Sequence, residues 1–416
     1  NSIASGGNYN VTVGDEAGTA ITTGDANVAI GYQALIANTE ASYITGVGYQ
    51  ALKLNTTGTA NVALGADALR QNLTGAANVA VGNNALVLNT ASNNTAVGKD
   101  AGTAVTSGTQ NTFVGALAGD GTDDGSNNVA VGFEALSANC GSQNTALGTR
   151  SGKVTTGAEN TFVGSTAGTG NTSGVQNTFV GSQAGDQNTD GSNNVAIGFQ
   201  TLGADSADDN VAVGVNALQA CTGGNNSALG PQAGLNATSA FNCTFLGHDA
   251  GVTGSPGGNH TGGHDEILFG NGAISAAHIQ VDWTVASDQR DKTDFTALDL
   301  GLDFIKALAP VTYKWDKRSK YGDKYADDYD LNEQTPDGTH KEDWLDVGFK
   351  AQEVEALEQA AGYNKSNKTN LVTSLTADGK QYGMQYSKFI PILVKAMQEQ
   401  NALIEALTAR VATLEG

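Results

Sequence analysis

Cysteine is scarce in this chain. Cys140, Cys221 and Cys243 are the three cysteines among 416 residues, an odd number with no CxxC spacing. This pattern argues against a disulfide framework and against a zinc site, so we expect small core or loop residues. His260 and His264, which have acidic neighbours, lie in a glycine-rich break where such residues are usually solvated. We therefore expect no metal and no other cofactor.

Basic residues are also scarce, and unevenly so. Residues 1–286 contain five Lys and Arg against twenty Asp and Glu, whereas residues 287–416 contain sixteen against twenty-two. The formal net charge is −21. An acidic surface of this kind argues against nucleic-acid and anionic-membrane partners, which require basic patches. The sequence has no apolar run long enough to cross a bilayer, so we expect no membrane insertion.

The first 250 residues contain a short repeat. A segment of the form Asn-Val/Thr-Ala/Phe-Ile/Val/Leu-Gly recurs fifteen times with occasional departures, usually followed by two variable residues and then Ala-Leu or Ala-Gly. The period is always 16 or 17 residues, and the anchor glycines are Gly14, Gly31, Gly48, Gly65, Gly82, Gly98, Gly115, Gly132, Gly148, Gly164, Gly181, Gly198, Gly214, Gly230 and Gly247. A repeat this short and regular predicts stacked coils, a mainly β solenoid or β-roll shaft.

Each repeat contains the parts of one coil. Strand side chains alternate, so Val28 and Ile30 share one face, which we predict to be the inward face. The glycine allows a corner with positive φ. The alanine three residues later, such as Ala34, fits a crowded turn; thirteen of fifteen repeats keep it, and Ser151 and Thr201 replace it in the others. The remaining half of each repeat is rich in Thr, Asn, Gly and Asp, a typical loop composition.

The composition changes near residue 255. Forty-seven of the fifty-five glycines precede residue 287. We predict a repeat shaft over 1–254, a transition and cleavage junction over 255–286, an α+β domain over 287–385 and a coiled coil over 386–416. Within the transition, DEILFG (265–270) is typical of a last, irregular strand.

Helical periodicity is found only after the shaft. The segment 296–308 predicts a helix that ends before Pro310 and is followed by the strand-like VTYKW, with one apolar face formed by Leu298, Leu302, Ile305 and Leu308. Near the C-terminus, apolar residues are spaced four and three apart, with Gln400 as one polar member: Ile390, Leu393, Met397, Gln400, Ile404, Leu407, Val411 and Leu414. This heptad seam predicts a self-associating, trimeric coiled coil.

Four blocks in the C-terminal third carry a family resemblance. VDWTVASDQRDKTDF (281–295) contains Ser-Asp-x-Arg-x-Lys, and APVTYKW (309–315), VGFKAQEVEAL (347–357) and YGMQYSKFIPILVKAMQEQ (382–400) follow in order. Together these blocks resemble the endosialidase-type intramolecular chaperone at the C-terminus of phage tail fibres and tailspikes. The resemblance covers residues 287–416.

The resemblance implies a trimerising domain that folds the preceding β-fibre and is released by autoproteolysis before the motif serine. The cleaved bond would then be Ala286–Ser287, with Ser287 as nucleophile and Lys292 as general base. A lysine can act as a base only when neutral, which requires burial or a neighbouring cation such as Arg290. We expect Asp288 and Arg290 to shape the turn. The segment 317–345 departs from the family pattern as a long, charged, tyrosine-rich insertion.

Three classes of function remain open at this stage. The first is the shaft of a viral tail fibre or spike, located on the virion and extracellular, with a homotrimer, a host cell-surface receptor such as a glycan, and other virion tail proteins as partners. The second is a cellular trimeric adhesin, because the repeats also resemble trimeric autotransporter adhesin heads; against it, the chain ends in the heptad seam. The third, a β-solenoid polysaccharide depolymerase, is disfavoured because aromatics make up only 6% and are spread thinly.

Overall fold

The computed structural model describes residues 7–274, 276–280, 283–324, 326, 328–364, 366, 369, 371–376 and 378–416. It divides into a shaft unit (Asn1–Val252 and Thr261–Phe269) and a C-terminal unit (Thr253–His260 and Gly270–Gly416). Parts of three segments discussed above lie outside the described residues: residues 1–6 of the shaft, Val281 and Asp282 of 281–295, and Tyr325 and Asp327 of 317–345.

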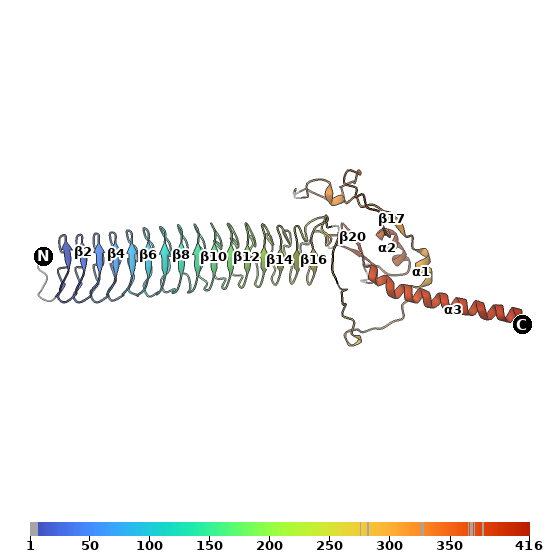
Figure 1. The fold of residues 1–416 in the computed structure, drawn as a ribbon, viewed down its shortest axis with the longest axis horizontal. Coiled ribbons are helices and arrows are strands. Elements are labelled where there is room, and N and C mark those ends of the chain that lie inside the picture. Colours follow the sequence, from blue (N-terminus) through green and yellow to red (C-terminus); the bar gives the residue numbers. More distant parts are fainter. Residues whose placement is uncertain are drawn as a thin grey trace. The chain divides into compact units, whose positions relative to one another are not determined.

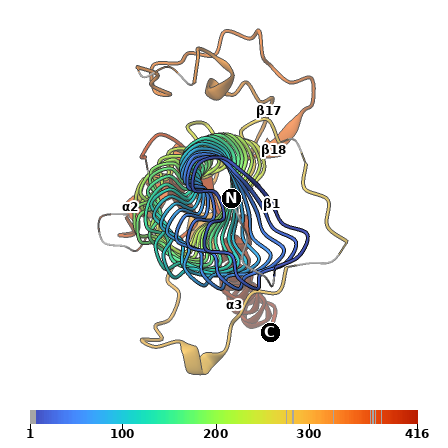
Figure 2. The same ribbon diagram turned by 90° about the vertical axis from the view of Figure 1, so that its left-hand side faces the viewer.

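The shaft unit is a parallel β-solenoid. Its strands form one 16-stranded sheet in sequence order (Figure 1). The strands are β1 (Val11–Val13), β2 (Val28–Ile30), β3 (Thr45–Val47), β4 (Val62–Leu64), β5 (Val79–Val81), β6 (Thr95–Val97), β7 (Thr112–Val114), β8 (Val129–Val131), β9 (Thr145–Leu147), β10 (Thr161–Val163), β11 (Thr178–Val180), β12 (Val195–Ile197), β13 (Val211–Val213), β14 (Ser227–Leu229), β15 (Thr244–Leu246) and β16 (Ile267–Phe269). Figure 2 shows the coils stacked one behind another. The mainly β solenoid is confirmed, and so is the last strand, β16, which pairs in parallel with β15.

The predicted inward face of the strands is wrong by one residue. The middle residue of β2, Ala29, is fully buried, whereas Val28 is partly exposed and Ile30 is exposed. The alternation was correct but its phase was not, because a three-residue strand presents only one side chain to the interior. In β2 this one inward position belongs to Ala29, the middle residue of the strand. Ala34, predicted to lie in a crowded turn, is buried as expected.

The anchor glycines are required for two reasons. Gly14 has φ +128°, a conformation that other residues rarely adopt. A Cβ atom added there would also lie 2.7 Å from the carbonyl oxygen of Gly31 in the next coil. The predicted positive φ is therefore confirmed, and the close approach of successive coils adds a second constraint that the sequence did not show.

Phenylalanine and glycine complement each other inside the shaft. Phe113 takes the middle strand position of β7 and is fully buried. Its ring occupies space beside two glycines: a Cβ on Gly119 would lie 2.6 Å from the ring, and one on Gly102 3.0 Å. In the next coil the strand carries Ala130, and the position equivalent to Gly119 is the buried Leu136. In the repeats, Phe at the middle strand position always accompanies Gly at the later position, and Leu at the later position always accompanies Ala or Gly in the strand.

This exchange predicts a compensating pair of substitutions. Phe113→Ala should destabilise the shaft by about 3–5 kcal/mol, because it leaves a cavity where the ring lay. Adding Gly119→Leu should recover part of that loss, since Leu136 already adopts positive φ at the equivalent position. Urea unfolding followed by circular dichroism would measure both variants. A double variant less stable than Phe113→Ala alone would contradict the proposed complementarity.

A ladder of buried asparagines joins neighbouring coils. The side-chain oxygen of Asn61 accepts the backbone N–H of Asn78 at 2.9 Å, and its Nδ2 donates to the carbonyl of Gly75 at 2.7 Å. The bond is repeated from Asn78 to the N–H of Asn94, also at 2.9 Å. Buried polar groups need such partners, so each Asn fixes the position of the next coil.

The three cysteines are buried in the shaft. The Cys140 sulfur lies 3.2 Å from the hydroxyl of Thr122. Burial raises the pKa of the Cys221 thiol to about 11. A thiol with so high a pKa is a poor nucleophile at neutral pH, which agrees with a packing role.

One outward position of the sheet is apolar along its whole length. The third residue of all 16 strands is Val, Ile, Leu or Phe, whereas the first is Val, Thr, Ser or Ile. No strand of this sheet places a charged residue at either position. Val114 and Val131, on adjacent strands, are 37% and 38% exposed. We call the outward third strand positions the apolar row.

The C-terminal unit is a small α+β assembly. Its helices and strands are η1 (Gln289–Asp291), α1 (Leu302–Ala307), β17 (Val311–Tyr313), η2 (Arg318–Lys320), β18 (Asp346–Gly348), α2 (Ala351–Ala360), β19 (Thr373–Leu375), β20 (Tyr382–Met384), η4 (Tyr386–Lys388) and α3 (Phe389–Glu415), where η marks a 3-10 helix. β17 pairs with β18 and β19 with β20, both antiparallel. Across the described residues, no helix combines the length and apolar character needed to cross a membrane.

The helix predicted over 296–308 is shorter than expected. α1 begins only at Leu302, because Gly301 has the non-helical angles φ −139° and ψ −133°. Phe304, which the predicted face omitted, is its buried residue. Leu298, Ile305 and Leu308 still pack against the same core, so the apolar face was mostly correct. The strand after Pro310 is confirmed as β17.

The predicted heptad lies almost entirely on one continuous helix, α3. Its seam residues are exposed in the single chain, with Met397 at 68% and Leu407 at 64%. The N-terminal end of α3 is different, since Phe389, Ile392 and Ala396 are buried in the C-terminal unit. The chain therefore exposes a second apolar surface in addition to the apolar row.

Candidate functional site

Ser287 and Lys292 are brought together by a single helical turn. Between them lies η1, and Lys292 ends this turn by donating its backbone N–H to the carbonyl of Gln289. The turn folds the lysine side chain back, so that Nζ lies 2.6 Å from the Ser287 hydroxyl oxygen and 3.4 Å from the Ser287 carbonyl oxygen. The amine is thus within hydrogen-bonding reach of the hydroxyl, as a general base must be.

Asp288 and Arg290 shape this turn. The Asp288 carboxylate caps η1 by accepting the backbone N–H of Arg290 at 2.8 Å, and it also binds the Arg290 guanidinium at 2.6 Å. The bonds from Arg290 lower the pKa of the Asp288 carboxyl group below its usual value. The Arg290 guanidinium is therefore paired with the Asp288 carboxylate within the turn.

The Ser287–Lys292 pair is open to solvent in the single chain. All described residues from 273 to 297 are exposed, including Ala286, Ser287 and Lys292. Burial, which the chemistry requires, is therefore not supplied by the rest of this chain's described residues. A covering surface from another copy would exclude water and favour a neutral amine.

The downstream sequence blocks meet in the folded unit. Tyr313 and Trp315 both donate to the Asp346 carboxylate, at 3.3 and 3.2 Å, across the β17–β18 pair. Burial, and then the Asp346 charge, raise the pKa of Tyr313, so its hydroxyl remains a donor. Phe349 lies 5.3 Å, centroid to centroid, from Phe389 at the start of α3. These contacts join the blocks 309–315, 347–357 and 382–400.

Two buried or partly buried carboxylates hold the helices of this unit. Glu358 on α2 is fully buried and accepts the backbone N–H groups of Leu371, Val372 and Thr373 and the Thr373 hydroxyl. Glu399 on α3 accepts the N–H of Leu302 at 2.7 Å, at the first residue of α1. This bond lowers the pKa of Glu399. The two carboxylates therefore tie α2 to β19 and α3 to α1.

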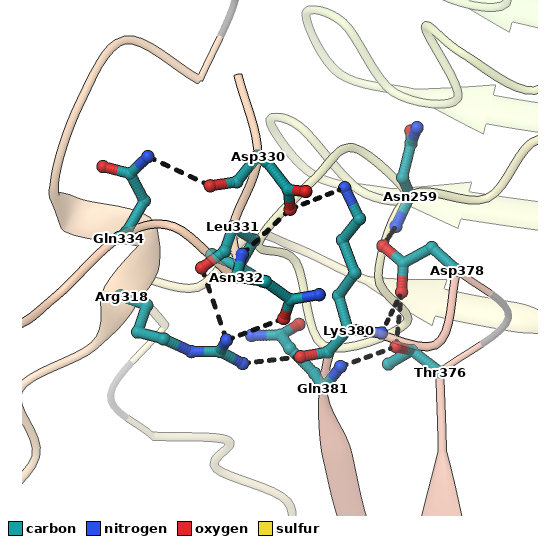
Figure 3. Close-up of polar contacts among 10 residues, drawn as sticks. All are labelled: Asn259, Arg318, Asp330, Leu331, Asn332, Gln334, Thr376, Asp378, Lys380 and Gln381. Carbon is teal, nitrogen blue, oxygen red and sulfur yellow. Dashed lines mark hydrogen bonds and ion pairs between the residues drawn. The ribbon is translucent and has the colours of Figure 1, made fainter. Parts of the chain in front are cut away.

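The insertion 317–345 packs on the β19–β20 hairpin. Arg318 donates to the carbonyl of Lys380 at 2.5 Å and to the Asn332 side chain at 3.0 Å (Figure 3). The Lys380 amine in turn lies 3.0 Å from the Asp330 carboxylate. Leu331, which lies between Asp330 and Asn332 in sequence, is fully buried. In sequence, the insertion follows the Ser287–Lys292 turn. In the structure, it is hydrogen-bonded to the β19–β20 hairpin.

The comparison with family models supports the C-terminal assignment. Residues 287–363 match the family described as the chaperone of endosialidase. The match begins at Ser287 and includes Lys292, the insertion and α2. No curated protein and no solved structure gives a significant match. The chain therefore combines a parallel β-solenoid shaft with a C-terminal segment that matches the endosialidase chaperone family.

Several residues that matter in the structure were not found from the sequence. The signal for the asparagine ladder was the Asn that opens thirteen of the fifteen repeats, with Ile44 and Cys243 in the other two. Glu358 gave no signal, because nothing local distinguishes it from the other acidic residues of α2. Among the described residues, no group of three or more His, Cys, Asp or Glu side chains is arranged to hold a metal ion.

Proposed function

We propose that this protein is the shaft of a viral tail fibre or tailspike, folded and trimerised by its C-terminal chaperone domain, and that it attaches the particle to a host cell. The observation that carries the proposal is that a shaft with an exposed apolar row precedes a segment that matches the endosialidase chaperone family. Its partners would be two further copies of the chain, other tail proteins of the virion and a receptor on the host surface, for which a glycan is one candidate.

The apolar row and the α3 seam support a parallel homotrimer. Contiguous exposed apolar surfaces of this length are rare in soluble monomers and usually mark an interface. Identical coils from parallel chains would place the same Val and Leu side chains together at every level. Because the α3 seam has heptad spacing, it would associate in the same parallel sense.

The proposal includes one cleavage per chain. When neutral, the Lys292 amine accepts the Ser287 hydroxyl proton, and Oγ attacks the carbonyl carbon of Ala286. The bond from that carbon to the Ser287 nitrogen breaks, and the nitrogen takes the proton from the lysine ammonium. Water then hydrolyses the resulting ester, leaving a carboxylate on Ala286 and restoring the hydroxyl of Ser287. Trimer assembly would trigger the reaction by covering the exposed turn.

Assembly can be tested on the intact chain. Multi-angle light scattering should give the mass of a trimer. Val114→Lys with Val131→Lys should abolish or strongly reduce trimer yield, because charges would enter the apolar row. Asp124→Lys with Asp190→Lys, at exposed loop positions outside the row, should leave the trimer intact. A monomer or dimer mass for the unmodified chain would refute the fibre proposal.

A further inference from the structure

Residues on both sides of the Ala286–Ser287 bond pack together within the C-terminal unit. The backbone N–H of Asn259, upstream of the bond, donates to the Asp378 carboxylate, downstream of it, at 2.8 Å (Figure 3). Gly258 lies so close to this loop that an added Cβ would be 2.7 Å from Cβ of Thr376. We call the contacts of Gly258 and Asn259 with Thr376 and Asp378 the clasp.

The Asp378 carboxylate is held in place for this contact. Its Oδ1 accepts the Thr376 hydroxyl at 2.5 Å and the Lys380 N–H at 3.1 Å, so its Oδ2 is directed to Asn259. Burial alone would raise the pKa of Asp378, but these three hydrogen bonds together lower it. The carboxylate is therefore charged at neutral pH, and charge-assisted hydrogen bonds are stronger than neutral ones.

The insertion 317–345 braces the downstream side of the clasp. Arg318 binds the Lys380 carbonyl, and Asp330 binds the Lys380 amine, so both ends of that residue are tied to the insertion. Ser319 also lies against the upstream side, since an added Cβ on Gly254 would collide with its side chain. The insertion 317–345 thus contacts residues on both sides of the proposed cut.

We infer that cutting the Ala286–Ser287 bond does not release the C-terminal fragment, because the clasp and its insertion keep residues 253–260 bound to it. The exposed linker 273–297 carries the cut, whereas the clasp lies outside that linker. Cleavage of the Ala286–Ser287 bond by the protein itself is part of the proposed function, whereas retention of the C-terminal fragment depends only on the clasp. An experiment can therefore contradict either one without contradicting the other.

The test makes the cut with an added protease. A recognition sequence is inserted between Ala277 and His278 in a Ser287→Ala background, so that only the added protease cuts. After complete digestion, size-exclusion chromatography should show both fragments eluting together. Asp378→Ala should raise the dissociation rate of the cut fragments roughly ten- to hundredfold, as expected for loss of a hydrogen bond to a charged group.

Two further variants keep the result interpretable. Gly258→Ala changes the upstream side of the clasp and should also speed dissociation, even if Asp378→Ala folds poorly. Asp303→Ala, at a fully exposed carboxylate on α1, should behave as the unmodified protein. Fragments that separate as soon as the unmodified chain is cut would overturn retention. Equal dissociation rates for the Asp378→Ala, Gly258→Ala and Asp303→Ala proteins would overturn the clasp as its cause.

Discussion

Purified protein should give two bands on a denaturing gel, whereas Ser287→Ala and Lys292→Ala should each give a single full-length band. Removing the hydroxyl removes the nucleophile, and removing the amine removes the base that lies 2.6 Å from that hydroxyl. N-terminal sequencing of the smaller band should return SDQRDK. The expected effect is a complete loss of cleavage, because each side chain takes part in the same step.

Lys292→Arg separates the role of base from that of positioning. A guanidinium can still donate to the serine hydroxyl, but it does not lose its proton in proteins, so cleavage should again be absent. Lys306→Ala, at an exposed lysine on α1, should cleave normally. Cleavage that persists in Ser287→Ala would exclude this nucleophile. A single uncut band for the unmodified protein would mean that the domain trimerises the chain without cutting it.

Deleting residues 287–416 before expression should leave nearly all of the shaft aggregated or unfolded. The coils are nearly identical, so a slip by one whole repeat between chains would still match apolar side chains with apolar side chains. Until three chains align, the apolar row is exposed and can associate in wrong registers. A domain that trimerises first would set the alignment before the shaft closes.

Solubility and mass of the deleted chain measure this effect, by sedimentation and light scattering. The control reaches a shaft without the domain by a different history. The full chain carrying Asp378→Ala, which weakens the clasp, folds first and is then cut in the linker by an added protease. Once the C-terminal fragment has been separated, the shaft should stay soluble and trimeric. Soluble trimer obtained directly from the deleted chain would show that the domain is dispensable for folding.

Much of the architecture follows from local sequence alone. The 16- or 17-residue period predicts the stacked coils, and the anchor glycines predict the positive-φ corners, because both depend on contacts that every repeat makes with an identical neighbour. The heptad on α3 likewise follows from the spacing of apolar residues along the sequence. Ser287 and Lys292 could be named from a motif, and the short η1 turn between them explains why five positions of separation bring them into contact.

Other features were decided only by the tertiary structure. Alternation in a three-residue strand allows two phases, and the stacking of the coils places Ala29, rather than Val28 and Ile30, in the interior. α1 is short because Gly301 adopts non-helical angles, which periodicity does not reveal. The bond between Asn259 and Asp378 joins residues 119 positions apart. No local sequence pattern predicts this contact, because it depends on how the β19–β20 hairpin and residues 253–260 pack in three dimensions.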